Sequence, residues 1–164
     1  MEGKIIQINI SPGGVPKRPV PECEISPLGL KGDEQAHPQI HGGAAKAVLL
    51  IAAEVIDELA AMGYPVFYGA LGENLTTRGI DTRRLRIGDQ IRAGSAVLEI
   101  TRPRFPCTAL DVYGKGIQAE IWDDAVKLLD PSSLKWGRSG FYLRVVSPGL
   151  VRTKDIIMVS ASLA

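Results

Sequence analysis

Apolar residues along the chain gather in short runs that are separated by glycine and proline. Several runs are rich in β-branched residues or alternate between apolar and polar positions, and both patterns are typical of strands. We expect strands at residues 5–10, 22–26, 46–51, 84–87, 90–92, 96–100, 141–146 and 156–159. Short strands at this spacing favour a barrel or sandwich over alternating strand–helix units.

Two further segments have the helical period. In residues 53–62 the apolar side chains lie on one side and the acidic side chains on the other, and Gly63 follows as a C-terminal stop. Residues 117–129 have a broad apolar face and end before Pro131. We therefore expect a mostly β fold, barrel-like, with about two α-helices, and one domain over residues 1–164.

Composition narrows the class of protein. Of the 164 residues, 45% are hydrophobic, which is a globular rather than a disordered composition. The longest apolar run, residues 47–53, is far shorter than the roughly 18 residues of a membrane helix, and the first residues lack the apolar core of a signal peptide. A net charge of +1 argues against a nucleic-acid coat. We expect a cytoplasmic protein without a membrane or nucleic-acid partner.

The two cysteines differ in their surroundings. Cys23 and Cys107 are too few and too far apart for a disulfide framework. Cys23 lies in a short strand pattern, and we interpret it as a packing residue. Cys107 follows Arg102 and Arg104, and cations near a thiol favour the thiolate, which is both a nucleophile and a metal ligand. Cys107 is therefore the candidate reactive residue.

Four clusters combine glycine with polar side chains. Paired glycines let the backbone approach a ligand and direct N–H groups at an anion, while arginine and lysine bind phosphate. The clusters are Gly32-Asp33 with His41-Gly42-Gly43 and Lys46, residues 69–74, residues 102–107, and residues 137–140 followed by Tyr142 and Arg144. Together they indicate a cleft for an anionic ligand with a sulfur at one end. Glycines in a barrel are also ordinary turn residues, and the residues alone leave both interpretations open.

Six motifs follow one another along the chain: Gly-Leu-Lys-Gly-Asp (29–33), His-Gly-Gly-x-x-Lys-Ala-Val (41–48), Gly-Ala-Leu-Gly-Glu-Asn-Leu (69–75), Ile-Gly-Asp (87–89), Arg-x-Pro-Cys (104–107) and Gly-Arg-x-Gly-Phe-Tyr-Leu-Arg-Val (137–145). Their order closely resembles the MOSC domain, the C-terminal domain of molybdenum cofactor sulfurases, which also occurs as standalone bacterial proteins. Two positions depart from the pattern: Ala44 and Ala45 stand where many members have a polar pair, and Lys154-Asp155 stands where Gly-Asp is common.

The resemblance implies a barrel of the MOSC type that binds the pterin-based molybdenum cofactor, of the molybdopterin type. Cys107 matches the motif cysteine, which is held to bind molybdenum or to carry sulfur as a persulfide. The residues expected to contact the cofactor are His41, Gly42, Gly43, Lys46, Asn74, Arg104, Arg138, Tyr142 and Arg144. No pyridoxal phosphate is expected in this chain, so its sulfur or electrons would come from another protein, a desulfurase or an electron donor.

Three functions follow from the resemblance. The first is a molybdenum-dependent oxidoreductase that acts on N-hydroxylated compounds and uses the Cys107 thiolate as the protein ligand to the metal. The second is a sulfur carrier in which Cys107 accepts a persulfide and delivers it to a metal centre. The third is a non-catalytic carrier of the cofactor. We favour the first.

Overall fold

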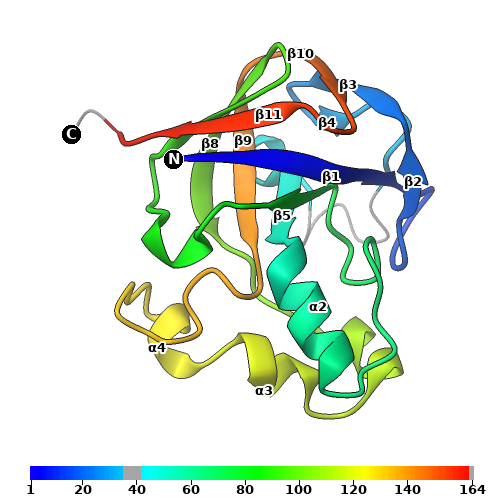
Figure 1. Cartoon of the computed structure of the whole chain (residues 1–164), viewed down its shortest axis with the longest axis vertical. Coiled ribbons are helices and arrows are strands. Elements are labelled where there is room, and N and C mark those ends of the chain that lie inside the picture. The colour runs from blue at the N-terminus through cyan, green and yellow to red at the C-terminus, as the bar shows by residue number, and fades with distance from the viewer. Residues whose placement is uncertain (35–41, 163–164) are drawn as a thin grey trace.

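The computed structural model of the chain describes residues 1–34 and 42–162 (Figure 1). The strands are β1 (Glu2–Ile10), β2 (Arg18–Val20), β3 (Glu22–Ser26), β4 (Gly29–Leu30), β5 (Val48–Ala52), β6 (Leu75–Arg78), β7 (Gln90–Ala93), β8 (Ala96–Pro103), β9 (Phe141–Ser147), β10 (Gly149–Arg152) and β11 (Ile156–Ser160). The α-helices are α2 (Ala53–Ala61), α3 (Ile117–Ile121) and α4 (Asp124–Lys127), and the 3-10 helices are η1 (Ala44–Lys46), η2 (Thr82–Arg84) and η3 (Thr108–Tyr113). None of the helices in these described ranges has the length and apolarity needed to cross a bilayer.

Seven strands close into a barrel. Their order is β11-β7-β8-β9-β5-β6-β1, and β1 pairs again with β11, with Gly3 opposite Ile157. The pair β5–β6 is parallel, and the neighbouring pairs around the ring are antiparallel. Strand β2 extends the sheet as an edge, where Pro19 costs no ladder hydrogen bond. This closed sheet, with β10, β3 and β4 as a smaller second sheet, confirms the expected barrel-like, mostly β fold.

The hydrophobic residues form two clusters that share strands. Leu50 of β5 and Phe141 of β9 belong to the cluster inside the barrel. Leu49, Ile51 and Tyr142 on the same two strands point the other way and pack in an outer cluster with α2, η3 and α3. Both faces of β5 are covered, which explains why its sequence is a continuous apolar run rather than an alternation. The α-helices α2, α3 and α4 lie together at one end of the barrel (Figure 1).

The prediction of a strand at residues 84–87 is wrong. Residues 82–84 form η2 and the following residues form a turn. The Asp81 carboxylate accepts a hydrogen bond from the Arg83 amide, and Asp89 accepts one from the Arg86 amide at 2.8 Å. Side-chain acceptors at both ends of the segment favour turns over a ladder. Leu85 is buried while Ile87 is exposed, so the alternation has no half-buried sheet behind it.

The helix expected over residues 117–129 is divided into α3 and α4. Trp122 has an extended backbone, and Asp123 then begins α4 as its N-cap, accepting from the Val126 amide at 2.8 Å. The apolar period continues across the break, which is why the pattern predicted one helix. Leu128, at the end of this pattern, is 80% exposed instead of packed.

Candidate functional site

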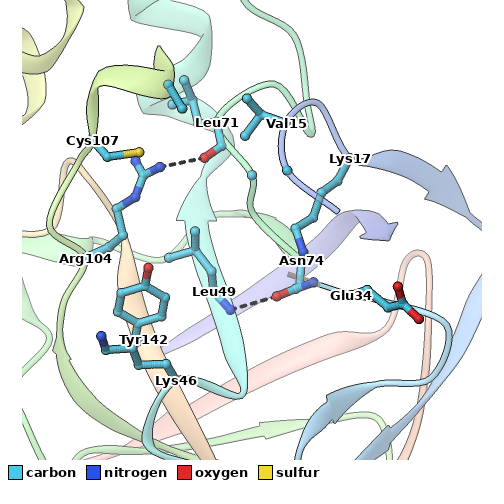
Figure 2. Close-up of a pocket in the computed structure, with 13 residues that line it drawn as sticks. Val15, Lys17, Glu34, Lys46, Leu49, Leu71, Asn74, Arg104, Cys107 and Tyr142 are labelled. Carbon is cyan, nitrogen blue, oxygen red and sulfur yellow. Dashed lines mark hydrogen bonds between the residues drawn. The ribbon is translucent and has the colours of Figure 1, made fainter. Parts of the chain in front are cut away.

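A pocket with a volume of about 160 Å³ lies where loops from distant parts of the chain meet above strands β5 and β9 (Figure 2). The residues that line it are Gly14, Val15, Lys17, Glu34, Lys46, Leu49, Leu71, Gly72, Asn74, Arg104, Cys107, Ala109 and Tyr142. Five of these, from Lys46 to Tyr142 along the chain, were predicted as site residues: Lys46, Asn74, Arg104, Cys107 and Tyr142. The fold therefore brings much of the predicted set into one place.

Arg104 is the most deeply buried cation of the pocket. It follows the end of β8 and is only 5% exposed. Its Nη2 donates to the Leu71 carbonyl oxygen at 2.9 Å (Figure 2), whereas its buried Nη1 has no hydrogen-bond partner in the described part of the chain. An unsatisfied buried donor costs about 1–3 kcal/mol, and more when it is charged. The chemistry of this donor fits an anionic or carbonyl oxygen of a ligand.

The Gly137–Gly140 segment fixes the backbone of Arg104 on both sides. The Arg104 amide donates to the Gly140 carbonyl oxygen at 2.9 Å. The Ser139 hydroxyl, which is fully buried, donates to the Arg104 carbonyl oxygen at 2.6 Å. This segment was predicted to contact the ligand through an arginine of its own. In the structure its backbone and serine hold the pocket arginine instead.

Tyr142 and Lys46 line the pocket on the same side as Arg104 (Figure 2). Tyr142 is 7% exposed, and burial raises the pKa of its phenol, while the positive charge of Arg104 acts in the opposite direction. The phenol therefore keeps its proton at Oη. The Lys46 ammonium group lies 5.7 Å from the centre of the Tyr142 ring, within cation–π range. Lys46 ends the short helix η1, which sets its side chain beside β9.

Cys107 lies at the Arg104 end of the pocket. Its thiol is a free thiol on a half-buried residue, and in Figure 2 it points toward the same part of the pocket as the Arg104 guanidinium. Cys23 has a different place. It belongs to the barrel cluster, its sulfur donates to the Lys31 carbonyl oxygen, and burial raises its pKa. Cys23 is thus a packing residue, and Cys107 is the thiol that faces a cavity.

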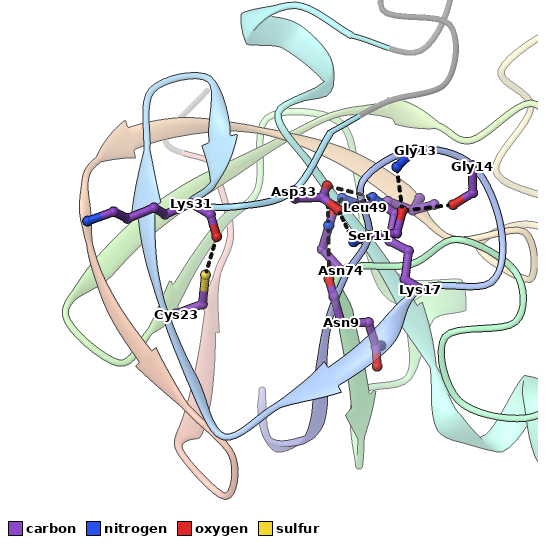
Figure 3. A network of polar contacts seen from close by, with 10 residues as sticks. All are labelled: Asn9, Ser11, Gly13, Gly14, Lys17, Cys23, Lys31, Asp33, Leu49 and Asn74. Atoms are coloured by element: carbon purple, nitrogen blue, oxygen red, sulfur yellow. Dashed lines mark hydrogen bonds and ion pairs between the residues drawn. The ribbon is translucent and has the colours of Figure 1, made fainter.

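A buried ion pair forms the far wall (Figure 3). The Lys17 ammonium donates to both carboxylate oxygens of Asp33, at 2.6 and 2.5 Å. The same carboxylate accepts from the Ser11 amide at 2.9 Å and from Asn74 Nδ2 at 2.9 Å. Both side chains of the pair are less than a tenth exposed. The charge of Lys17 is therefore balanced within the protein by Asp33.

Asn74 connects three segments. Its Oδ1 accepts from the Leu49 amide at 3.0 Å, and its Nδ2 donates to the Asn9 carbonyl oxygen and to Asp33. Both amide hydrogens are therefore used inside the protein. Asn74 lines the pocket, but its hydrogen bonds show that it ties β5 to β1 and to the Asp33 network.

Other predicted residues lie elsewhere. Arg138 lines a second hollow, where its Nη1 donates to Glu58 at 2.7 Å. Arg144 is exposed on the barrel exterior and forms a two-point ion pair with Glu99 at 2.9 Å. The structure does not bring these two arginines to the pocket.

The His-Gly-Gly motif is described in part. His41 lies outside the described residues. Gly42 and Gly43 precede η1, and Gly43 has a φ of 95°, a conformation that glycine adopts without strain. Among the described lining residues neither glycine is present; they lead the chain into the helix that carries Lys46.

Sequence reasoning missed Lys17 and the loop around it. This proline-rich stretch was expected to be a connection or an edge. In the structure the Lys17 amide donates to the Gly69 carbonyl oxygen at 2.9 Å, which joins the loop to the motif at residues 69–74. A side chain on Gly69 would collide with the Lys17 carbonyl oxygen. No local pattern reveals this contact, because the two loops are far apart in the chain.

Comparison with known proteins agrees with the motifs. The MOSC domain matches residues 37–158. Protein YiiM of Escherichia coli is 32% identical over 138 residues, which are 79% of this chain and 55% of YiiM. The uncharacterized protein YflK of Bacillus subtilis is 33% identical over 143 residues, which are 84% of this chain and 59% of YflK. The chain thus spans just over half the length of these two relatives.

A solved structure shows the same fold. The crystal structure of the YuaD protein of Bacillus subtilis superposes with a TM-score of 0.71 at 21% identity, over 97% of this chain and 96% of that one. The family model matches more than half of the sequence. The motif order and the barrel point to the same family. The chain belongs to the MOSC domain family.

Proposed function

We propose that the chain binds the pterin-based molybdenum cofactor in the Cys107 pocket and acts as an oxidoreductase on N-hydroxylated compounds. The observation that carries the proposal is the buried Arg104 Nη1, which has no partner in the described part of the chain and lies in one pocket with the free Cys107 thiol. Membership of a family named after molybdenum cofactor sulfurases supports the choice of ligand.

The pocket residues divide the work of binding. Arg104 and Lys46 would hold the anionic groups of the cofactor, because a guanidinium and an ammonium group both bind phosphate oxygens. The Cys107 thiolate would be the protein's ligand to the metal, since the thiolate is the metal-binding form of cysteine. Tyr142 holds a proton at Oη, and the apolar walls at Val15, Leu49 and Leu71 keep water away from the bound face.

The proposed reaction needs a second protein. Reduction of an N–OH group to N–H breaks the N–O bond, takes up two electrons and two protons, and releases water. When bound, the cofactor supplies the oxygen-atom chemistry, and the chain supplies orientation and electrostatics. The electrons would come from a separate donor protein.

The test is the molybdenum and pterin content of protein purified from a host that makes the cofactor. We expect the wild type to contain both components. Cys107→Ala should contain several-fold less molybdenum, and Arg104→Ala several-fold less pterin. Two matched controls, Cys23→Ala and Arg144→Ala, change the same residue types outside the pocket and should keep the wild-type content. A wild type that holds neither component, also after loading with isolated cofactor, would overturn the proposal.

The two other functions give different results in the same experiment. If Cys107→Ala keeps full cofactor content while Arg104→Ala loses it, the chain is a carrier without a metal–thiolate bond. If mass spectrometry after incubation with a sulfur donor shows one added sulfur atom that Cys107→Ser abolishes, the chain is a sulfur carrier. Either result contradicts the thiolate-ligand assignment.

A further inference from the structure

Glu73 is a fully buried carboxylic acid behind the pocket, between the lining residues Gly72 and Asn74. Its Oε1 accepts a hydrogen bond from the Gly69 amide at 2.6 Å and another from the Thr76 hydroxyl at 2.9 Å. Its Oε2 is buried and has no hydrogen-bond partner in the described part of the chain. A buried carboxyl group that satisfies only one of its oxygens is costly to the fold, and such groups call for a physical explanation.

The contacts of Oε1 close the loop at residues 69–74. They join the first residue of the loop to the side chain near its end and to β6 behind it. The Leu71 carbonyl oxygen projects from this loop and accepts from Arg104 Nη2. The Glu73 carboxyl group therefore fixes the acceptor that orients the Arg104 guanidinium and leaves Nη1 toward the pocket.

The charges of the two side chains also interact. Burial raises the pKa of Glu73, and the hydrogen bonds to Oε1 and the positive charge of Arg104 act in the opposite direction. Burial raises the pKa of Tyr113, which lies on η3, and the charge of Glu73 raises it further. Arg104 and Tyr113 are the titratable groups found to interact with Glu73 in the described ranges. No ion pair joins Glu73 to Arg104 among the described residues, so the coupling acts through space, where low dielectric strengthens it.

We infer that Glu73 is a positioning residue for Arg104: it fixes the loop that orients the guanidinium, and its ionisation weakens the attraction of Arg104 for an anion in the pocket. The inference rests on the anion-binding role proposed for Arg104. A neutral Glu73 leaves the full charge of Arg104 to the ligand, and an ionised Glu73 offsets part of it.

Sulfate is a suitable probe because it keeps its double charge between about pH 5 and pH 9. Sulfate affinity is measured by calorimetry across that range for the wild type and for Glu73→Gln. The glutamine oxygen can still accept from Gly69 and Thr76, so this variant removes the charge and keeps the loop. The control is Glu54→Gln. Like Glu73, Glu54 has one oxygen that accepts from a backbone amide and one buried oxygen without a partner in the described residues. It lines the second hollow instead of the pocket.

We expect the sulfate affinity of the wild type to fall relative to that of Glu73→Gln as Glu73 ionises with rising pH, by about tenfold once ionisation is complete. Where Glu73 is still protonated, the two proteins should bind sulfate equally well. Glu54→Gln should follow the wild type. Equal profiles for wild type and Glu73→Gln would overturn the inference while leaving the pocket intact.

Arg104→Met separates this failure from failure of the proposed function. We expect it to lose most of the sulfate affinity at every pH. If it binds sulfate as well as the wild type does, or if the wild type binds none, the anion site at Arg104 is wrong, and both the inference and the anion-binding part of the proposed function fall with it.

Discussion

Among the ion pairs formed by the described residues, Lys17–Asp33 is the most deeply buried. Its side chains are 8% and 5% exposed, whereas those of the neighbouring Lys31–Glu24 pair are 76% and 67% exposed. Removing one partner of a buried pair strands a charge away from water, while an exposed pair contributes little.

We therefore predict that Asp33→Asn lowers the free energy of unfolding by about 3–5 kcal/mol, because Lys17 would be buried without a counter-charge. The matched change Glu24→Gln should cost less than about 1 kcal/mol, because the remaining charge of Lys31 stays hydrated. Urea denaturation of the two variants measures the difference. A cost for Asp33→Asn no larger than that for Glu24→Gln would contradict the stabilising role of the pair.

Glu73 gives a second prediction at this scale, on stability and pH. Its pKa is raised in the folded protein, so ionisation favours the unfolded chain, in which a glutamate titrates near about 4.3. Below that pH both states are protonated and the group costs nothing. As the pH rises toward the folded pKa, the penalty grows to its full value.

Glu73→Gln removes this penalty. We expect the melting temperature of the variant, relative to the wild type, to rise steadily from pH 4 upward and to level off once Glu73 is ionised in the folded protein. Thermal denaturation monitored by circular dichroism measures the relative change, which is insensitive to any constant cost of the amide. A difference that stays flat or falls with rising pH would show that Glu73 titrates normally or at a lowered pKa.

At the scale of elements, the turn before β9 shows how one segment positions another. Gly140 has a φ of 86°, and a Cβ there would collide with the Leu50 carbonyl oxygen in β5. The Gly140 carbonyl oxygen holds the Arg104 amide. The close approach of this turn to β5 therefore sets the position of the pocket arginine.

Gly140→Ala should lower the free energy of unfolding by about 2–4 kcal/mol, because backbone strain and the collision act together. It should also weaken sulfate binding at Arg104. Gly63→Ala is the matched control: its φ is 98°, but a Cβ there meets nothing within 4 Å. We expect Gly63→Ala to lower the free energy of unfolding by about 1 kcal/mol through strain alone and to leave the sulfate affinity unchanged. Equal losses for the two variants would show that the contact with β5 does not matter.

Elements were predictable where local pattern and tertiary setting agreed. Residues 22–26 and 53–62 became β3 and α2 nearly as expected, because one face of each is buried and the other is exposed. Strand β6 was not predicted: its residues Leu75–Thr77 are buried in succession, so no alternation marks them. Its parallel pairing with β5 is a long-range contact that local sequence does not encode.

At the scale of the whole molecule, two hydrophobic clusters share β5 and β9. Leu50 and Phe141 face the barrel interior, while Leu49 and Tyr142 belong to the outer cluster under the helices. Loss of either cluster exposes one face of the same strands. We therefore expect the barrel and the helical layer to unfold together.

Leu98→Ala inside the barrel and Leu59→Ala in α2 should each lower the free energy of unfolding by about 2–5 kcal/mol, since both side chains are fully buried. For both variants, urea transitions followed by tryptophan fluorescence, which includes Trp136 in the barrel cluster, and by far-ultraviolet circular dichroism should coincide. Two separate transitions would divide the chain into two units and contradict the predicted single domain.

The sequence by itself determined the mostly β class, the packing role of Cys23, and Cys107 as the reactive candidate, because strand alternation, turn glycines and motif order are local features of the chain. It also identified Lys46, Arg104 and Tyr142, whose side chains line one pocket with Cys107.

Tertiary structure alone decided which cations the pocket contains. Arg138 and Arg144 pair with glutamates elsewhere, and Lys17 enters from a loop without any motif. The reason is that closing the barrel brings together residues that are far apart in the chain. The hydrogen bonds and ion pairs formed between them determine which charges are neutralised and which can meet a ligand.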